Sequence, residues 1–207
     1  RTALTAGVLV LAVSNGIGLG HAIRDSVDDV LGWYAKMLKA DWVLTQAGAL
    51  SVSRQDRGAA SRAMQEEVAR LDGVADVEGI GVATGRIAGQ ACVVVARDLP
   101  AGLPLPLEPV EATEADVRAA LERGEAVAGT VLAQRTGLKA GDEAMVEVFG
   151  RTTPVRIAAL VVDYTSGGAS LVVRRDAARR LFGMEAADVL LVTAAAGRSA
   201  ALREPLE

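Results

Sequence analysis

Cysteine and histidine are almost missing from this sequence, which has one of each, Cys92 and His21, among 207 residues. A single cysteine rules out a disulfide within the chain. One cysteine and one histidine also cannot build a Cys/His zinc site, which needs more ligands of these kinds. No set of residues has the spacing of a catalytic constellation. The sequence therefore predicts no catalytic residue, no metal site and no cofactor.

An excess of positive charge is missing as well. The chain carries 22 Lys and Arg against 26 Asp and Glu, which gives a net charge of −4. Proteins that bind nucleic acid usually present a basic surface to the phosphates. We therefore expect no nucleic-acid partner.

Aromatic residues make up only 3% of the chain, although 51% of it is hydrophobic. The apolar content is therefore mainly Ala, Val and Leu, and the mean hydropathy of +0.29 is high for a soluble protein of this size. The length allows one large domain or two small ones with a packed core.

Charged residues are missing from the whole segment between Arg1 and Arg24. As a helix, Thr2–Ile23 would extend roughly 33 Å, and the hydrocarbon core of a bilayer is about 30 Å thick. Within it, Ala12, Gly16 and Gly20 recur every four residues and share one helix face, which lets another helix approach closely in lipid. The segment predicts a membrane-spanning helix in contact with lipid, with these three residues as its packing surface.

Two other helical interpretations of this segment stay open. A secretory signal peptide usually has a shorter apolar part that ends at a small-residue cleavage site, whereas this run ends at Ile23-Arg24-Asp25. A buried helix of a soluble domain is the second, although Gly16, Gly18 and Gly20 would weaken it.

A nucleotide-binding loop is a further alternative for the same segment. Val8–Val13 followed by three closely spaced glycines resembles the strand and glycine turn of a short-chain dehydrogenase. However, the early glycine of that motif falls at Ala12. Neither Tyr34 nor Tyr164 is followed by Lys four residues later.

The helical pattern continues beyond the uncharged run. Apolar residues follow three- and four-residue spacing, and Asp and Lys residues lie mostly off that stripe. The stripe consists of Ile23, Val27, Val30, Leu31, Tyr34 and Leu38. It predicts an amphipathic stalk that connects the membrane to a domain, and a helix packed on its own domain is the alternative.

Strand and helix patterns follow one another irregularly after residue 40, which predicts an α+β domain. We expect strands over Val74–Ala83 and Arg86–Ala96, joined by a hairpin turn at Thr84-Gly85. In the turn over residues 137–142, we expect Gly141 to supply a positive φ and Asp142 to hydrogen-bond the turn backbone.

Two arginines share one face of the helix expected over Arg174–Phe182. Arg175 and Arg179 are four residues apart, so their side chains lie one turn from each other. This face is either a solvated basic surface or a contact for an anion.

Three groups of motifs, in this order, resemble an FtsX-like permease of an ABC transporter with a MacB-type periplasmic core domain. A charged residue and a short Thr/Ala segment open a span that leads to a stalk and a strand. A strand and a helix then precede a Gly-Leu-x-x-Gly-Asp turn, and a strand, a helix and a strand follow. The segments are Thr2–Thr5, Ala40-Asp41, Ala126–Ala133, Gly137-Leu138, Gly141-Asp142, Arg174–Phe182 and Val189–Thr193.

This resemblance implies an architecture. Residues 1–40 would be the transmembrane helix and stalk. Residues 41–98 plus 186–207 would form a ferredoxin-like layer (βαββ…βα), and residues 99–185 would form a smaller β-rich subdomain inserted into it. The resemblance also implies four spans in the whole permease, of which this chain would carry the first.

The resemblance implies partners and a location too. It predicts an ABC ATP-binding subunit, a second copy of the permease, and a place in the bacterial inner membrane with the domain on the extracytoplasmic side. The expected function is to couple ATP-driven membrane motion to an extracytoplasmic client, with ATP hydrolysis on the partner subunit. The alternatives are an NAD(P)-binding dehydrogenase-like protein and a single-pass anchored binding module.

Overall fold

The computed structural model describes residues 2–37, 40–45, 54–100 and 104–203. Within these ranges, the side chains of residues 2–12, 30, 33–37, 54–57, 59–60 and 165–166 are left out of the description. The chain consists of two units, Arg1–Leu38 and Lys39–Glu207. We call the first the helical unit and the second the domain.

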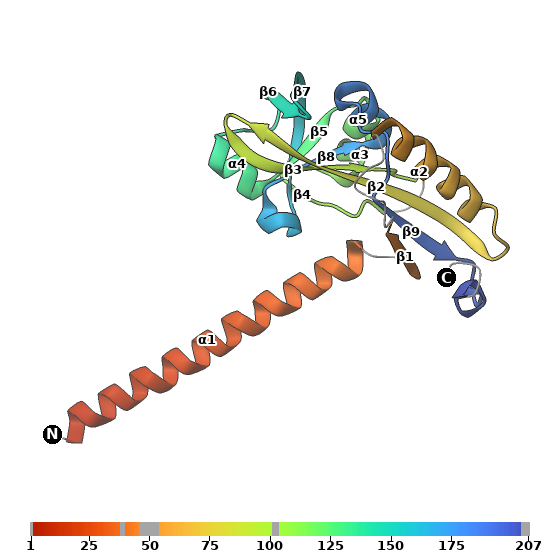
Figure 1. Ribbon diagram of the computed structural model, residues 1–207. Coiled ribbons are helices and arrows are strands. Elements are labelled where there is room, and N and C mark those ends of the chain that lie inside the picture. Colours follow the sequence, from red (N-terminus) through yellow and green to blue (C-terminus); the bar gives the residue numbers. More distant parts are fainter. Residues whose placement is uncertain (1, 38–39, 46–53, 101–103, 204–207) are drawn as a thin grey trace. The chain divides into compact units, whose positions relative to one another are not determined.

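The helical unit is formed by α1, a single helix over Thr2–Met37 (Figure 1). The helix continues without a break through Val8–Val13 and through Gly16, Gly18 and Gly20. A nucleotide-binding motif needs a strand, a loop and then a helix over these residues. The dehydrogenase interpretation is therefore wrong, because Val8–Gly20 is helical throughout and contains neither the strand nor the glycine loop that the motif needs.

In the part of the chain with described side chains, no helix is both long enough and apolar enough to span a bilayer. Residues 2–12 of the expected span lie outside that part. The span over Thr2–Ile23 stays a prediction.

The domain alternates short helices with the strands of one sheet. Its elements are β1 (Trp42–Thr45), α2 (Arg54–Ala69), β2 (Val74–Ile87), β3 (Gln90–Arg97), β4 (Glu108–Val110), α3 (Glu114–Glu122), β5 (Ala126–Gly129), α4 (Thr130–Thr136), β6 (Glu143–Val148), β7 (Arg151–Val162), η1 (Thr165–Gly168), β8 (Ser170–Arg174), α5 (Arg175–Phe182), β9 (Val189–Ala194) and η2 (Ser199–Leu202).

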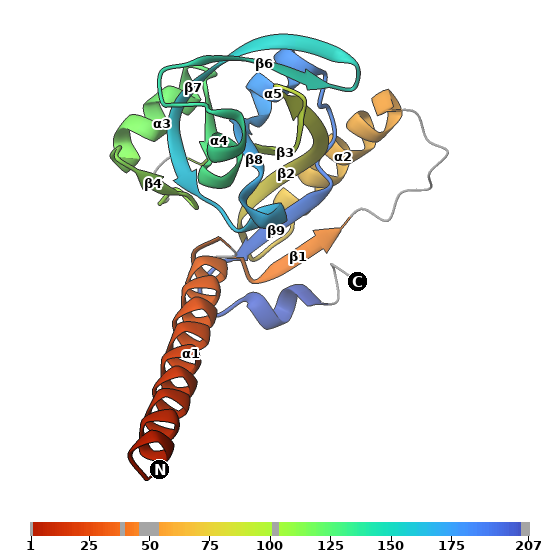
Figure 2. The ribbon, with the colours of Figure 1, turned by 90° about the vertical axis from the view of Figure 1, so that its left-hand side faces the viewer.

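The strands follow the order β1-β9-β2-β3-β8-β5-β7-β4, and β6 lies off this path. β6 pairs with both β2 and β7. This double pairing closes β2, β3, β8, β5, β7 and β6 into a barrel (Figure 2). β9 and β1 extend the sheet from the first half of β2, and β4 pairs with β7.

Two apolar clusters form on the two sides of the barrel wall. The first contains alternate residues of the barrel strands, such as Val94 and Val146, together with Phe182 from α5. The second lies under α3 and contains Val95, Leu121 and their neighbours. Val94 and Val95 fall into different clusters because successive side chains of a strand point to opposite faces.

A bulge at Ala158 lets β7 contribute to both clusters. Ala126 of β5 pairs with Ile157, but the next residue, Val127, pairs with Ala159. Because of the extra residue, side chains after the bulge point to the opposite face of the sheet from the one that strand alternation would give. Ile157 therefore belongs to the first cluster and Ala159 to the second, although they are two residues apart.

The hairpin between β2 and β3 differs from the sequence prediction. The turn lies at Ala88-Gly89, where both residues have positive φ, and β2 continues to Ile87. The expected turn glycine, Gly85, instead pairs with Cys92 of β3 and Val148 of β6. A Cβ at Gly85 would lie 2.9 Å from Val94 Cγ2 and 3.0 Å from the Glu147 carbonyl oxygen. Gly85 thus permits the close approach of strands where β6 joins β2.

The expected boundary between two subdomains is crossed by strand pairs. β3 lies in the segment 41–98 and pairs with β8 of the segment 99–185. β2 and β6 connect the same two segments. The ferredoxin-like layer and the β-rich insert stay predictions, and the observed fold is a mixed α+β domain on one sheet.

Candidate functional site

The predicted packing surface of α1 is open where its residues are described. A Cβ added to Gly16 or Gly20 would meet no atom within 4 Å. The side chain of Ala12 lies outside the described residues. This face has room for a neighbouring helix, which is a condition for the predicted role and not a test of it.

The described part of the predicted stalk carries three exposed apolar side chains. Ile23, Val27 and Leu31 are 56%, 50% and 60% exposed. Their four-residue spacing places them on one face of α1. Val30, Tyr34 and Leu38, which complete the predicted stripe, lie outside the residues with described side chains.

The turn at Gly141-Asp142 is hydrogen-bonded to the middle of β7. Gly141 has a φ of +93°, and the Lys139 amide donates a 2.8 Å hydrogen bond to Asp142 Oδ2. Gly141 N also donates to the Ile157 carbonyl, and Ile157 N donates to the Asp142 carbonyl. The turn therefore holds the chain beside the bulge at Ala158.

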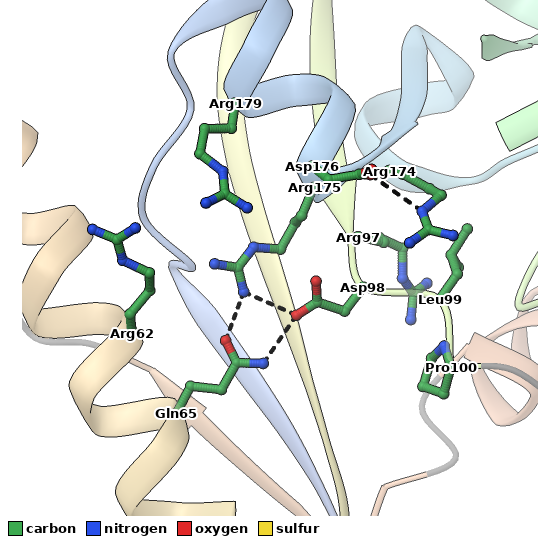
Figure 3. Close-up of a pocket in the computed structure, with 10 residues that line it drawn as sticks. All are labelled: Arg62, Gln65, Arg97, Asp98, Leu99, Pro100, Arg174, Arg175, Asp176 and Arg179. Carbon is green, nitrogen blue, oxygen red and sulfur yellow. Dashed lines mark hydrogen bonds and ion pairs between the residues drawn. The ribbon is translucent and has the colours of Figure 1, made fainter. Parts of the chain in front are cut away.

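A polar cleft of about 350 Å³ is the strongest candidate for a binding site in the described part of the domain. It lies where the parallel strands β3 and β8 end side by side, with Arg97 opposite Arg174 in register. Residues that follow β3, the start of α5, and one face of α2 complete it (Figure 3). Its lining consists of Arg62, Gln65, Arg97, Asp98, Leu99, Pro100, Arg174, Arg175, Asp176 and Arg179.

The carboxylate of Asp98 holds one side of the cleft together. Its Oδ2 accepts hydrogen bonds from Gly79 N at 3.1 Å, Gln65 Nε2 at 2.9 Å and Arg175 Nη1 at 2.9 Å. Arg175 Nη1 also donates to Gln65 Oε1 at 2.8 Å. These bonds tie β2, α2, the end of β3 and α5 to one oxygen atom, so the position of Arg175 is fixed from several sides.

Gly79 makes this arrangement possible. A Cβ at this position would overlap Arg175 Nη1 and lie 2.9 Å from Asp98 Oδ2. The bare backbone of β2 therefore lets Arg175 reach the Asp98 carboxylate.

Arg97 lines the base of the cleft and forms an ion pair with Glu78, which does not line the cleft. Its guanidinium makes a two-pronged contact with Glu78, with Nε–Oε1 at 2.6 Å and Nη2–Oε2 at 3.0 Å. Burial raises the pKa of Glu78 even though the hydrogen bond and charge of Arg97 lower it. Arg97 thus supports the base of the cleft with its charge balanced by Glu78.

Asp176, in the first turn of α5, is the centre of a second group of ion pairs. Asp176 accepts from Arg174 Nε at 3.2 Å and from Arg180 Nη1 at 3.3 Å. Burial raises the pKa of this carboxyl, but the Ala177 amide and the two arginines outweigh burial and leave the pKa lowered. Asp176 is therefore a charged carboxylate that neutralises the rim near Arg174.

Arg62 and Arg179 are the least neutralised cations of the lining. Arg62 lies 3.8 Å from Glu185 Oε2, and half of its side chain is exposed. Arg179 is exposed and makes no ion pair with the described residues. Figure 3 shows the guanidinium groups of Arg62, Arg175 and Arg179 turned toward the same space between α2 and α5.

The chemistry of this lining favours binding. Its two carboxylates, Asp98 and Asp176, accept hydrogen bonds from arginines, and its other charged residues are all guanidinium groups. Among the described residues, no group of His, Cys, Asp and Glu could hold a metal ion. Guanidinium groups bind carboxylates and phosphates through paired hydrogen bonds.

The sequence indicated only part of the cleft. The shared face of Arg175 and Arg179 pointed to a basic surface or an anion contact, and both residues line the cleft. Arg175 is not a solvated residue, because its side chain is only 11% exposed. No sequence pattern indicated that Arg62, Gln65 and Asp98 belong to a binding site, because only the fold brings α2 and the end of β3 close to α5.

No family model matches this sequence, and no curated protein matches it. The solved structures that are similar to the chain include two transporter domains. The periplasmic region of MacB from Actinobacillus actinomycetemcomitans aligns with a TM-score of 0.49 and 8% identity, over 70% of this chain and 70% of that one. The extracellular domain of the noncanonic ABC-type transporter YknZ from Gram-positive bacteria aligns with a TM-score of 0.49 and 14% identity, over 77% of this chain and 86% of that one. The structural neighbours of this chain are thus the periplasmic or extracellular domains of MacB and YknZ.

Proposed function

We propose that this chain is the first span, stalk and extracytoplasmic domain of an ABC transporter permease in the bacterial inner membrane. In this proposal, ATP hydrolysis on a partner ATP-binding subunit moves the spans, and α1 passes that motion to the domain. The domain then acts on an extracytoplasmic client, by export or by mechanical signalling. The chain itself hydrolyses nothing.

The continuity of α1 is the observation that carries the proposal. One helix begins in a segment without charged residues and continues to Met37, five residues before β1 of the domain. Its described second half keeps an exposed apolar face at Ile23, Val27 and Leu31. A stiff helix that joins an uncharged segment to a folded domain suits the transfer of movement better than a flexible tether would.

A single-pass anchored binding module shares α1 with this proposal. The two differ in their partners, because only a permease pairs with an ATP-binding subunit and a second copy of itself. The open face at Gly16 and Gly20 favours the permease, since small residues serve helix packing in lipid.

Membrane attachment is tested by expressing chain 1–207 and a variant without residues 1–38 in bacteria, and by extracting the membranes with alkaline carbonate. We expect the longer chain in the membrane pellet and the shorter one in the supernatant. An alkaline phosphatase fused after Glu207, which is active only outside the cytoplasm, should be active on the longer chain. Release of both chains by carbonate, or an inactive reporter, would contradict the membrane placement.

Assembly is tested on the complete permease with Gly16→Leu. The added side chain should block close helix approach and reduce co-purification of a second, differently tagged copy or of the ATP-binding subunit. Gly18→Leu is the matched control, because a two-residue step turns its side chain to a different face of α1. Equal recovery of partners with both variants would show that the Gly16 face is not a packing surface.

A further inference from the structure

Arg175 keeps hydrogen-bonding capacity that the protein does not use. Both of its hydrogen bonds to the described residues come from Nη1, one to Asp98 Oδ2 and one to Gln65 Oε1. Its Nε and Nη2 donate to no group in the described part of the chain. The side chain is nevertheless only 11% exposed. A guanidinium that is fixed by one nitrogen and open at the others is oriented to receive an acceptor from the cleft.

Arg62 and Arg179 supply further donors to the same space from two different helices. Arg62 extends from α2, and its contact with Glu185 is at 3.8 Å, longer than a hydrogen bond. Arg179 lies one helical turn after Arg175 on α5, so both reach the cleft from one helix face. Arg62 is half-exposed and Arg179 is exposed, whereas the Arg175 side chain is only 11% exposed and is held beside Asp98 and Gln65.

The local charge is opposite to that of the whole chain. The lining holds five arginines and two aspartates, and Glu78 and Glu185 add two more carboxylates at its margin. Asp76, whose charge acts on Glu78 and Asp98, and Arg180, which pairs with Asp176, bring the count to six cations against five anions. One positive charge therefore remains here, in a molecule whose net charge is −4. Because Glu78, Asp98 and Asp176 already accept from Arg97, Arg175 and Arg174, the excess falls on the Arg62–Arg179 side.

We propose that this cleft binds an oxyanion group, a carboxylate or a phosphate, between Arg62, Arg175 and Arg179. Arg175 is the fixed donor, positioned by Asp98 and Gln65. Arg62 and Arg179 close on the anion from α2 and α5. The binding site lies wholly within the domain, so it does not depend on the membrane function proposed above.

The test uses chain 1–207 and two probes that separate the sources of such a group. Calorimetric titration with inorganic pyrophosphate represents a small soluble anion. Fluorescence anisotropy with a labelled hexaglutamate peptide represents an acidic segment of another protein. Both titrations are run at one fixed ionic strength, because exposed charge pairs weaken with salt.

The informative variant is the double substitution Arg62→Gln with Arg179→Gln. Both side chains are half-exposed or exposed and make no close ion pair, so the domain should keep its fold, which circular dichroism checks. Arg135→Gln is the charge control: it removes one arginine charge from α4, at the opposite end of β8, where β5 ends beside the first residues of that strand.

We expect saturable 1:1 binding of at least one probe and a loss of affinity of about tenfold or more in the double variant, since charge-assisted bonds to two arginines are removed. Arg135→Gln should bind like the parent chain. Pyrophosphate binding alone would identify a small anion as the ligand type, and hexaglutamate binding alone an acidic protein segment. Two outcomes would overturn the proposal: no saturable binding of either probe, or equal affinity in the double variant and the control.

Discussion

Arg97 and Glu78 form a two-pronged ion pair between β3 and β2 in which the arginine side chain is only 1% exposed. Arg97 is the largest of the fully buried side chains in the described domain. A charge at such depth is tolerated only with a partner, because the desolvation of an isolated guanidinium costs several kcal/mol. The pair thus links β2, from which β9 and β1 extend the sheet, to the end of β3, which borders the cleft.

Replacing Glu78 by Ala should destabilise the domain strongly. The substitution leaves the buried guanidinium of Arg97 without its carboxylate, a change that costs about 3–5 kcal/mol in comparable buried pairs. Urea unfolding followed by circular dichroism measures the free energy. The double variant Arg97→Met with Glu78→Leu should lose much less, because an apolar pair of similar size replaces both charges. A loss below about 1 kcal/mol in Glu78→Ala would refute the importance of the pair.

Gly79→Ala should destabilise the domain through Arg175. The new Cβ would overlap Arg175 Nη1, so the guanidinium must leave Asp98. We expect a loss of about 1–3 kcal/mol, as for other overpacked sites. In the background Arg175→Ala the same change should cost much less, since the atom that clashes is gone. Additive effects of the two substitutions in urea unfolding would mean that the clash is not the cause.

Cys92 should be unreactive while the domain is folded. Its thiol is 3% exposed inside the barrel, and burial raises its pKa to about 11. At pH 8 only about one thiol in a thousand is then the reactive thiolate. A thiol reagent such as dithionitrobenzoate should react negligibly with native protein and with one thiol per chain in urea. Rapid stoichiometric reaction in buffer alone would place the thiol outside the barrel core.

Asp176 should stabilise the folded chain at neutral pH and lose that effect in acid. Its pKa is lowered in the folded state by Ala177 N–H, Arg174 and Arg180, which outweigh the opposing effect of burial. A carboxyl with a depressed pKa contributes stability above its unfolded pKa, and this contribution is lost as the pH falls through the folded pKa. The stability difference between parent and Asp176→Asn should therefore shrink as the pH is lowered from 6 to below 3.8.

Urea unfolding at several pH values measures this difference. Arg135→Gln alters no carboxyl group, so its difference from the parent should change little over the same range. A parent–Asp176→Asn difference that stays constant or grows toward acid would contradict the assigned charge state.

Local sequence signals predicted several elements well. Thr113 caps α3 by accepting from Asp116 N, as the four-residue capping pattern indicates. α4 begins directly after Gly129 and ends at Gly137, whose φ of +75° is one that glycine adopts readily. These features depend on a few neighbouring residues, so a sequence pattern is enough to locate them.

Other features depend on contacts that no local pattern reveals. Gly85 looked like a turn residue because it follows a threonine between two apolar runs, but its role is to let three strands meet. Closure of the barrel by β6 requires pairing with β2, about 60 residues earlier in the chain. The cleft is hidden for the same reason, since Gln65 and Arg175 are 110 residues apart.

The bulge at Ala158, which turns the later side chains of β7 to the opposite face, has a consequence for the unfolding of the domain. A single strand, β7, supplies Ile157 to the interior of the barrel and Ala159 to the layer beneath α3. If α3 separated from the sheet, it would expose β7, the same strand that contributes side chains to the barrel interior. Neither layer can then unfold alone. We expect residues 74–100 and 104–203 to unfold in one all-or-none transition, with amide protons of β5 and β7 exchanging only through that global event.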